Sequence, residues 1–366
     1  MSAAPHLLLA VTAHGYGHLA QCAPVVEALT RRLPGLRVTL QGDIDPVFAR
    51  RRLPPGFVHR PQSADVALPM DGPLAVRWEA GLEAYAAFES DYERHLGRQL
   101  DLLRALAPDL VLADVPWLPL DAARRLGIPA AGLCSFAWYD ILRASPVAGR
   151  VPAALLERMR QVYRGADLFI RPAPALPMDW LPEARAVGPI AYRRPDRRAE
   201  LRQRLGVPAQ RPLALIQFGG FAGFAPWNDW PEQERVHWLV PRLDGRRRRD
   251  ASGLAEHGLD VFDVLGSVDL MLVKPGYGSY AEAACHGVPV LSVPRPDWPE
   301  SQTLNRWLRQ RVPTRDIGLP ELVAGALAEP IASLLAEGRP VPTDPVGAAE
   351  AAELLLPWLR RPRPGR

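Results

Sequence analysis

The segment 7–18, LLLAVTAHGYGH, joins an apolar run to a glycine turn that ends in histidine. Residues 7–11 are apolar without a break, which is the pattern of a strand buried on both faces. The residues after the turn, up to Leu29 and Arg32, have the apolar spacing of a helix. A buried strand, a glycine turn and a helix form one βα unit, so this segment predicts the start of a parallel α/β sheet.

The same alternation continues through the first half of the chain. A long helical pattern ends where Pro108 stops it, and a shorter one ends at Gly127, which suits a left-handed helix C-cap. Alternating βα units imply a parallel sheet. The expected strands are 37–41, 109–113 and 129–133, and the expected helices are about 82–106 and 118–126.

A second series of βα units begins with the apolar run 212–218, which ends at Gly219 and Gly220. Its other expected strands are about 235–240, 270–273 and 288–293, and a helix is expected from about Ser279. With 366 residues, the chain suits two cores. We predict two Rossmann-like parallel-sheet domains facing across a cleft: an N-terminal domain at 1–190, a proline-rich connection at 191–211, a C-terminal domain at 212–345, and a C-terminal helix with a basic tail at 346–366 that can pack on the first domain.

The composition is that of a globular protein, with 48% apolar and 23% charged residues. The early apolar run 7–11 is too short for a signal peptide or a membrane span, so we expect a cytoplasmic protein. Cys22, Cys134 and Cys285 are far apart and match no metal-binding or redox spacing. We expect these cysteines to be reduced and structural.

The formal charge of +4 comes from 44 basic and 40 acidic residues spread along the chain, which argues against a nucleic-acid partner. The basic runs 246–249 and 360–366 are interpreted as solvated loop and terminus, and a membrane-surface role is the weaker alternative. Lys274 is the only lysine, and Asn228 and Asn305 are the only asparagines, so these positions stand out from a strong bias toward arginine.

The segment 274–282, KPGYGSYAE, lies between a predicted strand and a predicted helix. Its two glycines let the backbone approach an anion, and the free N–H groups of the helix start point at it. Lys274 adds a positive charge and Ser279 a hydroxyl. Glu282 lies one helical turn further on, within reach of a ribose diol whose phosphates sit at the helix N-terminus. The alternative is a tight turn in which Glu282 caps the helix.

Polar side chains follow the next predicted strand. Asp297, Glu300, Gln302 and Asn305 lie within one short stretch, and carboxylates and amides suit the recognition of sugar hydroxyls. The alternative is a solvated loop and helix start.

His18 and Asp114 each follow a predicted strand of the first sheet. Ligands of such sheets bind outside the carboxyl ends of the strands, so the two side chains can meet there, with His18 as a base and Asp114 as the group that orients its ring. His14 is a nearby competitor for the role of base. The alternative is that His18 only bonds the backbone at the helix start.

The turn also matches a dinucleotide-binding pattern. Residues 15–20, GYGHLA, fit G-x-G-x-x-A after a strand, and Asp43 ends the second apparent strand. However, His18 inside the turn would crowd a pyrophosphate, and the segment 274–282 is better formed for phosphate. A nicotinamide or flavin oxidoreductase is therefore the weaker hypothesis.

These segments resemble the GT-B glycosyltransferases in order and spacing. More closely, the chain resembles the glycosyltransferase-like N-terminal region of plant arabinokinases over about residues 7–310. No sugar-kinase sequence follows these motifs here, so kinase activity is not expected. The motifs that carry the resemblance are GYGH at 15–18, SFAW at 135–138, FGG at 218–220, KPGYGS at 274–279 and the stretch 294–305.

The resemblance implies that His18 activates the acceptor, with Asp114 as its partner. It also implies that Gly278 and Ser279 hold the donor's diphosphate and that Glu282 holds the ribose hydroxyls. Glu300 and Gln302 would contact the donor sugar. The chain departs from the family pattern where it has LAQC at 19–22, since proline often follows the Gly-His turn shortly, and where Glu300 and Gln302 are separated by a serine.

We therefore predict a glycosyltransferase that moves a sugar from a nucleoside diphosphate sugar, expected to be UDP-linked, to an acceptor that the sequence does not name. Inversion follows if His18 is the base. The expected enzyme needs no metal and no cofactor besides the donor, and its oligomeric state stays open. The alternatives are a nucleotide-sugar binding module without catalysis, or a sugar-nucleotide epimerase of the same fold. The expected donor site comprises Gly17, Gly219, Gly220, Lys274, Gly276, Tyr277, Gly278, Ser279, Glu282, Glu300, Gln302 and Asn305.

Overall fold

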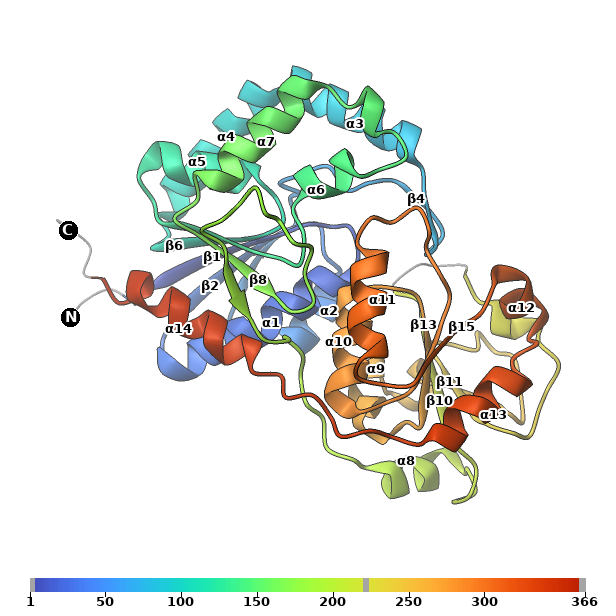
Figure 1. Ribbon diagram of the computed structural model, residues 1–366. Coiled ribbons are helices and arrows are strands. Elements are labelled where there is room, and N and C mark those ends of the chain that lie inside the picture. The colour runs from blue at the N-terminus through green and yellow to red at the C-terminus, as the bar shows by residue number, and fades with distance from the viewer. Residues whose placement is uncertain (1–3, 220–223, 362–366) are drawn as a thin grey trace.

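The computed structural model describes residues 4–219 and 224–361 (Figure 1). Two parallel sheets form two domains, which confirms the predicted fold class. The first sheet has seven strands in the order β3 (Val58–Arg60), β2 (Arg37–Gln41), β1 (His6–Val11), β6 (Leu110–Asp114), β7 (Ala130–Leu133), β8 (Leu168–Pro172) and β9 (Arg185–Val187).

Apolar side chains cover both faces of this sheet and form two cores. One core is closed by α3 (Trp78–Ser90), α4 (Tyr92–Leu106), α5 (Leu118–Leu126), α6 (Trp138–Arg143) and α7 (Ala153–Arg164). The other is closed by α1 (Tyr16–Arg32), α2 (Pro46–Arg52) and the C-terminal helix α14 (Gly347–Leu359). In Figure 1, α14 runs back across the molecule to lie beside α1, so the end of the chain completes the first domain.

The second sheet has six strands in the order β12 (Ala251–Gly253), β11 (His237–Val240), β10 (Leu213–Gln217), β13 (Leu270–Val273), β14 (Val290–Ser292) and β15 (Thr314–Asp316). One face packs on α8 (Arg198–Leu205), α9 (Val261–Val264), α10 (Tyr277–His286) and α11 (Ser301–Arg309). The other packs on α12 (Leu319–Ala324) and α13 (Ala328–Glu337). A small antiparallel hairpin of the first domain pairs β4 (Met70–Asp71) with β5 (Ala75–Val76).

The long helix expected at about 82–106 is two helices, because α3 ends at Ser90 and α4 begins at Tyr92. Asp91 between them has ψ near 13°, which takes the backbone out of the helix. Aspartate competes for backbone hydrogen bonds and therefore favours such breaks. The short strands β3, β4, β5, β8, β9, β12 and β15 were not predicted.

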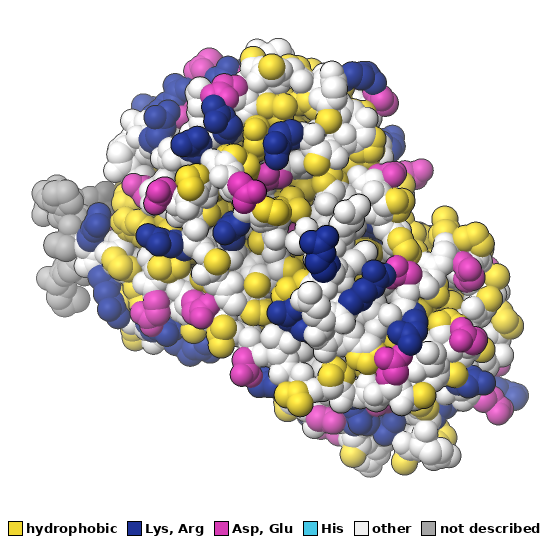
Figure 2. All heavy atoms as spheres, in the orientation of Figure 1, with side chains coloured by type: hydrophobic (Ala, Val, Ile, Leu, Met, Phe, Trp, Pro, Cys, Tyr) yellow, Lys and Arg dark blue, Asp and Glu magenta, His cyan; other side chains and the backbone are white. Residues whose placement is uncertain are grey.

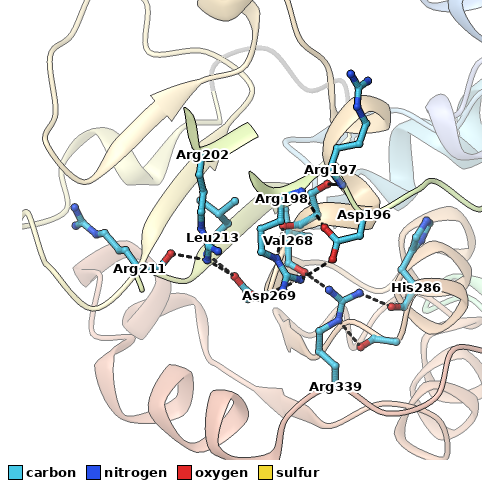
Figure 3. Close-up of polar contacts among 12 residues, drawn as sticks. Asp196, Arg197, Arg198, Arg202, Arg211, Leu213, Val268, Asp269, His286 and Arg339 are labelled. Carbon is cyan, nitrogen blue, oxygen red and sulfur yellow. Dashed lines mark hydrogen bonds and ion pairs between the residues drawn. The ribbon is translucent and has the colours of Figure 1, made fainter. Parts of the chain in front are cut away.

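The connection between the domains is fixed to the second domain by a partly buried network around Asp269 (Figure 3). The Asp269 carboxylate accepts the backbone N–H of Leu213 at 2.9 Å and pairs with Arg198 at 3.3 Å and Arg202 at 3.4 Å. Arg339 donates to the carbonyl oxygen of Val268 at 3.2 Å and to that of His286, the last residue of α10, at 2.6 Å. Helix α8, which lies inside the predicted connection 191–211, thereby becomes part of the second domain.

The charges show the mixing that the composition suggests. On the face drawn in Figure 2, Lys and Arg side chains alternate with Asp and Glu side chains over both domains. In the part of the chain that the structure describes, no helix combines the length and the apolar character that a membrane span requires.

Replacing Asp269 by alanine should lower the free energy of unfolding of the second domain by about 2–4 kcal/mol, because a buried N–H group and two guanidinium groups lose their acceptor. Urea denaturation measures this change. Asp101→Ala is the matched control, since Asp101 pairs with Arg104 on the exposed face of α4 and should contribute less than about 0.5 kcal/mol. Equal effects of the two substitutions would contradict the structural role of Asp269.

Candidate active site

A cavity of about 330 Å³ lies between the two domains. It is lined by the turn after β1, by the end of β10 and by the turn after β13. In both sheets the chain reverses its direction of strand addition at these strands, between β1 and β6 and between β10 and β13. Such switch points are the usual ligand sites of open α/β sheets. The cavity therefore joins the switch points of both domains.

The two glycine turns face each other across this cavity. A Cβ atom placed on Gly278 would lie 3.7 Å from Cα of Gly17 and 4.0 Å from Cβ of Ala20. Neither α1 nor α10 has a side chain that caps its N-terminus. Helix α10 begins at Tyr277, two residues earlier than expected, so the N–H groups of Tyr277, Gly278 and Ser279 belong to its first turn. Uncapped N–H groups of this kind can bind an anion.

His18 and Asp114 meet at the first switch point. Val11 pairs with Asp114 in the register of β1 and β6, which places the carboxylate beside the turn that carries His18. Nδ1 of His18 lies 2.9 Å from Oδ1 of Asp114, and the thiol of Cys22 donates to Oδ2 at 3.2 Å. Asp114 is fully buried, whereas His18 lines the cavity. A fixed carboxylate on Nδ1 therefore orients the imidazole, which makes Nε2 the nitrogen that can act as a base.

Burial by itself lowers the pKa of His18, but the Asp114 carboxylate opposes it through charge and hydrogen bonding. Glu300 and Asp65 add smaller effects in the same direction, so the pKa of His18 is raised above its ordinary value. The result is an imidazole that accepts a proton more readily than a free histidine does.

His14, the competing histidine, lies in an aromatic stack. Its ring is parallel to Trp298 at 5.2 Å and meets the edge of Trp138 at 5.4 Å. Burial lowers the pKa of His14 well below its ordinary value, and the positive charges of His18, Arg295 and Lys274 lower it further. His14 is therefore a neutral wall of the cavity, and His18 is the stronger base.

Lys274 and Arg295 are two cations that line the same cavity. Burial lowers the pKa of Lys274 to about 7, with a further decrease from the charge of Arg295, while Glu300 opposes it. Arg295 is 5% exposed and stacks on Trp298, and its Nη2 has no hydrogen-bond partner among the described residues. Two cations that repel each other in one cavity favour a bound anion.

Glu282 lies at the other end of the cavity, near the end of β10. It is 5% exposed, and its Oε1 is 3.9 Å from Nη1 of Arg52, a residue of the first domain. Burial raises the pKa of Glu282, while the charge of Arg52 and the amide of Gln217 oppose the increase. Within the described ranges, Oε2 of Glu282 and Oε1 of Gln217 have no hydrogen-bond partner at close range. These oxygens are free to accept hydrogen bonds from a ligand.

Glu300 links the two domains at the end of the cavity that holds His18. Its Oε1 accepts the hydroxyl of Ser135 at 2.6 Å, and its Oε2 accepts the indole N–H of Trp298 at 3.2 Å. Burial raises its pKa, whereas these two hydrogen bonds and the charge of His18 oppose the increase.

The structure does not bring Gln302 and Asn305 into the cavity. Helix α11 buries Ser301, Leu304 and Leu308 on one face. Gln302 therefore lies on its exposed face. The amide oxygen of Asn305 instead accepts the hydroxyl of Tyr280 at 2.8 Å. Neither amide lines the cavity, and their expected contact with the donor sugar stays a prediction.

The other predicted donor residues divide into three groups. Gly17, Gly219, Gly276, Gly278 and Ser279 line the cavity, and Gly219 has a φ of 80°, which glycine adopts without strain. Tyr277 also lines it, but its hydroxyl accepts the N–H of Ile190 and donates to the carbonyl of Ala173, so the side chain joins the domains. Gly220 lies outside the described residues. What these residues do for a donor stays a prediction.

Sequence reasoning missed Arg52 and Arg295. Arg52 ends a helix in the first domain and reaches the cavity only because the domains meet there, so its position gives no local signal. Arg295 follows the expected strand 288–293, yet the general bias toward arginine hid it.

A potential metal group is also present, since His18, Asp114 and Cys134 place ligand atoms within 4.8 Å of one another. In this arrangement the Asp114 carboxylate already holds Nδ1 of His18.

Replacing Asp114 by asparagine should lower the pKa of His18 below its ordinary value, because the desolvating effect of burial is then no longer opposed by the carboxylate. An NMR pH titration of the imidazole, assigned by comparison with His18→Gln, measures both pKa values. In wild type the protonated form should persist to a higher pH than in a free histidine. Asp43→Asn, at an exposed position, is the control, and an unchanged pKa in Asp114→Asn would refute the coupling.

Lys274 should titrate near pH 7, because burial and Arg295 disfavour its charged form. Since the chain has no other lysine, lysine labelled with ¹³C at Cε gives a single side-chain NMR signal, which makes the titration unambiguous. Arg295→Met should raise the pKa of Lys274 by removing a like charge. A wild-type value close to the ordinary lysine value would contradict the buried, cationic character of the cavity.

The chain is similar in sequence to two known proteins. No family model matches the chain. It is 26% identical over 311 residues to L-arabinokinase of Arabidopsis thaliana, which covers 83% of this chain and 30% of that protein. It is 25% identical over 270 residues to an uncharacterised glycosyltransferase of Methanopyrus kandleri. This match covers 68% of this chain and 74% of that protein. The chain thus spans about a third of the first of these relatives.

Among solved structures, the calicheamicin glycosyltransferase CalG4 matches with a TM-score of 0.62 and 18% identity over 98% of this chain and 99% of the other. UGT89C1 of Arabidopsis thaliana, complexed with UDP, matches with a TM-score of 0.54 and 14% identity over 96% of this chain and 94% of the other. The resemblance stated from the sequence is confirmed. The chain has the two-domain fold of the GT-B glycosyltransferases.

Proposed function

We propose that this protein is a glycosyltransferase that uses a nucleoside diphosphate sugar. The observation that carries the proposal is that one cavity holds an uncapped helix N-terminus, a buried carboxylate with one oxygen that has no partner among the described residues, and a histidine fixed by a buried aspartate. The first suits a diphosphate, the second a ribose and the third the activation of a hydroxyl. The fold and a relative named as a glycosyltransferase support the same function.

The diphosphate would lie at the N-terminus of α10, against Gly278 and Ser279. Lys274 would balance the charge that builds on the departing diphosphate, and Arg295 is close enough to Lys274 to share this role. Metal ions do this in other transferases, so two cations in the cavity support a metal-independent reaction. The ribose would contact Glu282, and the sugar would lie toward Glu300. UDP is the favoured nucleotide, as in the UDP complex of the plant structure.

His18 would remove the proton from the acceptor hydroxyl through its Nε2, while Asp114 stabilises the imidazolium that forms. The acceptor oxygen would then attack the anomeric carbon as the bond to the diphosphate oxygen breaks. Because base and leaving group lie on different domains, on opposite sides of the cavity, this arrangement supports inversion at that carbon.

Calorimetric titration of UDP, GDP, dTDP and ADP into the wild type tests the donor site. One nucleotide should bind with micromolar affinity, and Glu282→Ala should weaken it at least about tenfold, because ribose hydroxyls lose a charged acceptor. Glu353→Ala, at a carboxylate that is 62% exposed on α14, is the matched control and should bind normally. Failure of all four nucleotides to bind would overturn the proposal.

His18→Ala tests the catalytic assignment once an acceptor is found. Turnover should fall by roughly two to four orders of magnitude while nucleotide affinity stays nearly unchanged, since His18 acts on the acceptor. An unchanged rate would remove His18 from the mechanism. Product analysis separates the alternatives: a binding module gives no product, and an epimerase releases an altered donor sugar without any acceptor.

A further inference from the structure

Arg52 is a buried cation that the first domain places beside Glu282 in the cavity. It is the last residue of α2 and is 8% exposed. Its Nη1 lies 3.9 Å from Oε1 of Glu282, which is beyond hydrogen-bond distance. Nε and Nη1 of Arg52 have no hydrogen-bond partner in the part of the chain that the structure describes. A buried guanidinium with unmet donors is costly unless something else pairs with it.

The orientation of Arg52 is fixed by aromatic rings. Its guanidinium carbon lies 4.0 Å from the ring centre of Phe262, in α9 of the second domain, and 4.9 Å from that of Phe48. The hydroxyl of Tyr192 donates to the carbonyl oxygen of Arg52 at 3.3 Å. Contacts with the ring faces leave the N–H groups at the edge of the guanidinium plane available for hydrogen bonds. Arg52 is therefore held in place before any ligand binds.

The pair of Arg52 and Glu282 matches one kind of ligand group. A hydroxyl can donate its hydrogen to the carboxylate and accept an N–H from the guanidinium at the same time. Because Nη1 and Oε1 are 3.9 Å apart, one oxygen atom can lie at about 2.9 Å from both. A phosphate or a carbonyl oxygen would be repelled by Glu282, and an amine by Arg52. A ribose diol supplies the required hydroxyls.

We propose that Arg52 is a second ribose-binding residue, supplied by the first domain, so that the ribose of the donor is held between Arg52 and Glu282 and bridges the two domains. The inference rests on the proposed function and makes it narrower. It predicts that the site binds ribonucleoside diphosphates in preference to their deoxyribose counterparts. Arg52 acts on the donor only and has no part in the chemical step.

Titrations with UDP, 2′-deoxy-UDP and 3′-deoxy-UDP test this, using wild type, Arg52→Met and Arg52→Lys. Wild type should prefer UDP over at least one deoxy analogue by about tenfold or more. Arg52→Met should weaken UDP binding by about tenfold to a hundredfold. The ratio of UDP affinity to deoxy-analogue affinity should fall toward one, because an analogue without the hydroxyl makes no contact with Arg52 that the substitution could remove. Arg52→Lys keeps a positive charge and should retain part of the UDP affinity and part of the preference for UDP. Arg50→Met, two positions earlier on the exposed side of α2, should behave as wild type.

Thermal unfolding without ligand identifies a variant that has lost its fold, and Arg52→Lys then carries the test. Equal weakening of UDP and both deoxy analogues would overturn the ribose assignment, since Arg52 would then contact another part of the nucleotide or act only on the fold. Unchanged affinities in both Arg52 variants would overturn it as well, while leaving the proposed function intact. If wild type binds GDP or ADP instead of UDP, the same test applies to that nucleotide and its deoxy forms, whereas binding of dTDP alone would overturn the ribose assignment. No nucleotide binding at all would overturn both proposals.

Discussion

The close approach of the two glycine turns determines how this molecule is assembled. Gly17 in the first domain and Gly278 in the second are near enough that a side chain on Gly278 would already contact the opposite backbone. Because each turn opens a helix, this contact directs two helix N-termini into one cavity. The histidine and its aspartate come from one side and the lysine and glutamate from the other. Separating the turns by the width of a side chain would separate these groups as well.

The cavity also depends on burial to set its charges. Lys274, Arg295 and Glu300 lie within one water-poor space, and each has a pKa displaced toward the neutral form by that burial. Asp114 works in the opposite direction on His18, because its carboxylate opposes desolvation and, together with the charges of Glu300 and Asp65, leaves the pKa of His18 raised. One environment therefore weakens the charge of the lysine and strengthens the basicity of a histidine. The difference arises from which group has a partner in hydrogen-bond contact.

The sequence predicted the strands next to the switch points because each is apolar throughout and is followed by a glycine turn. It also predicted that His18 and Asp114 can meet, since both follow strands of one parallel sheet. It could not predict Arg52, whose place depends on how two domains dock, and no local pattern encodes docking. It placed Gln302 and Asn305 in the donor site, yet neither lines the cavity, because a polar pair within a few residues says nothing about which face of α11 is buried. The break at Asp91 was likewise hidden, since the helical spacing continues on both sides of it.

The return of α14 to the first domain means that the chain crosses between the domains twice. The two crossings lie side by side, because the N–H of Gly347 donates to the carbonyl of Pro189 at 3.0 Å and the N–H of Gly188 donates to Glu350 at 2.7 Å. Two adjacent tethers define an axis, whereas a single linker would allow the domains to swing freely. Opening of the cavity would then be a hinge rotation about this line, with α14 staying in place on the first domain as the second domain turns.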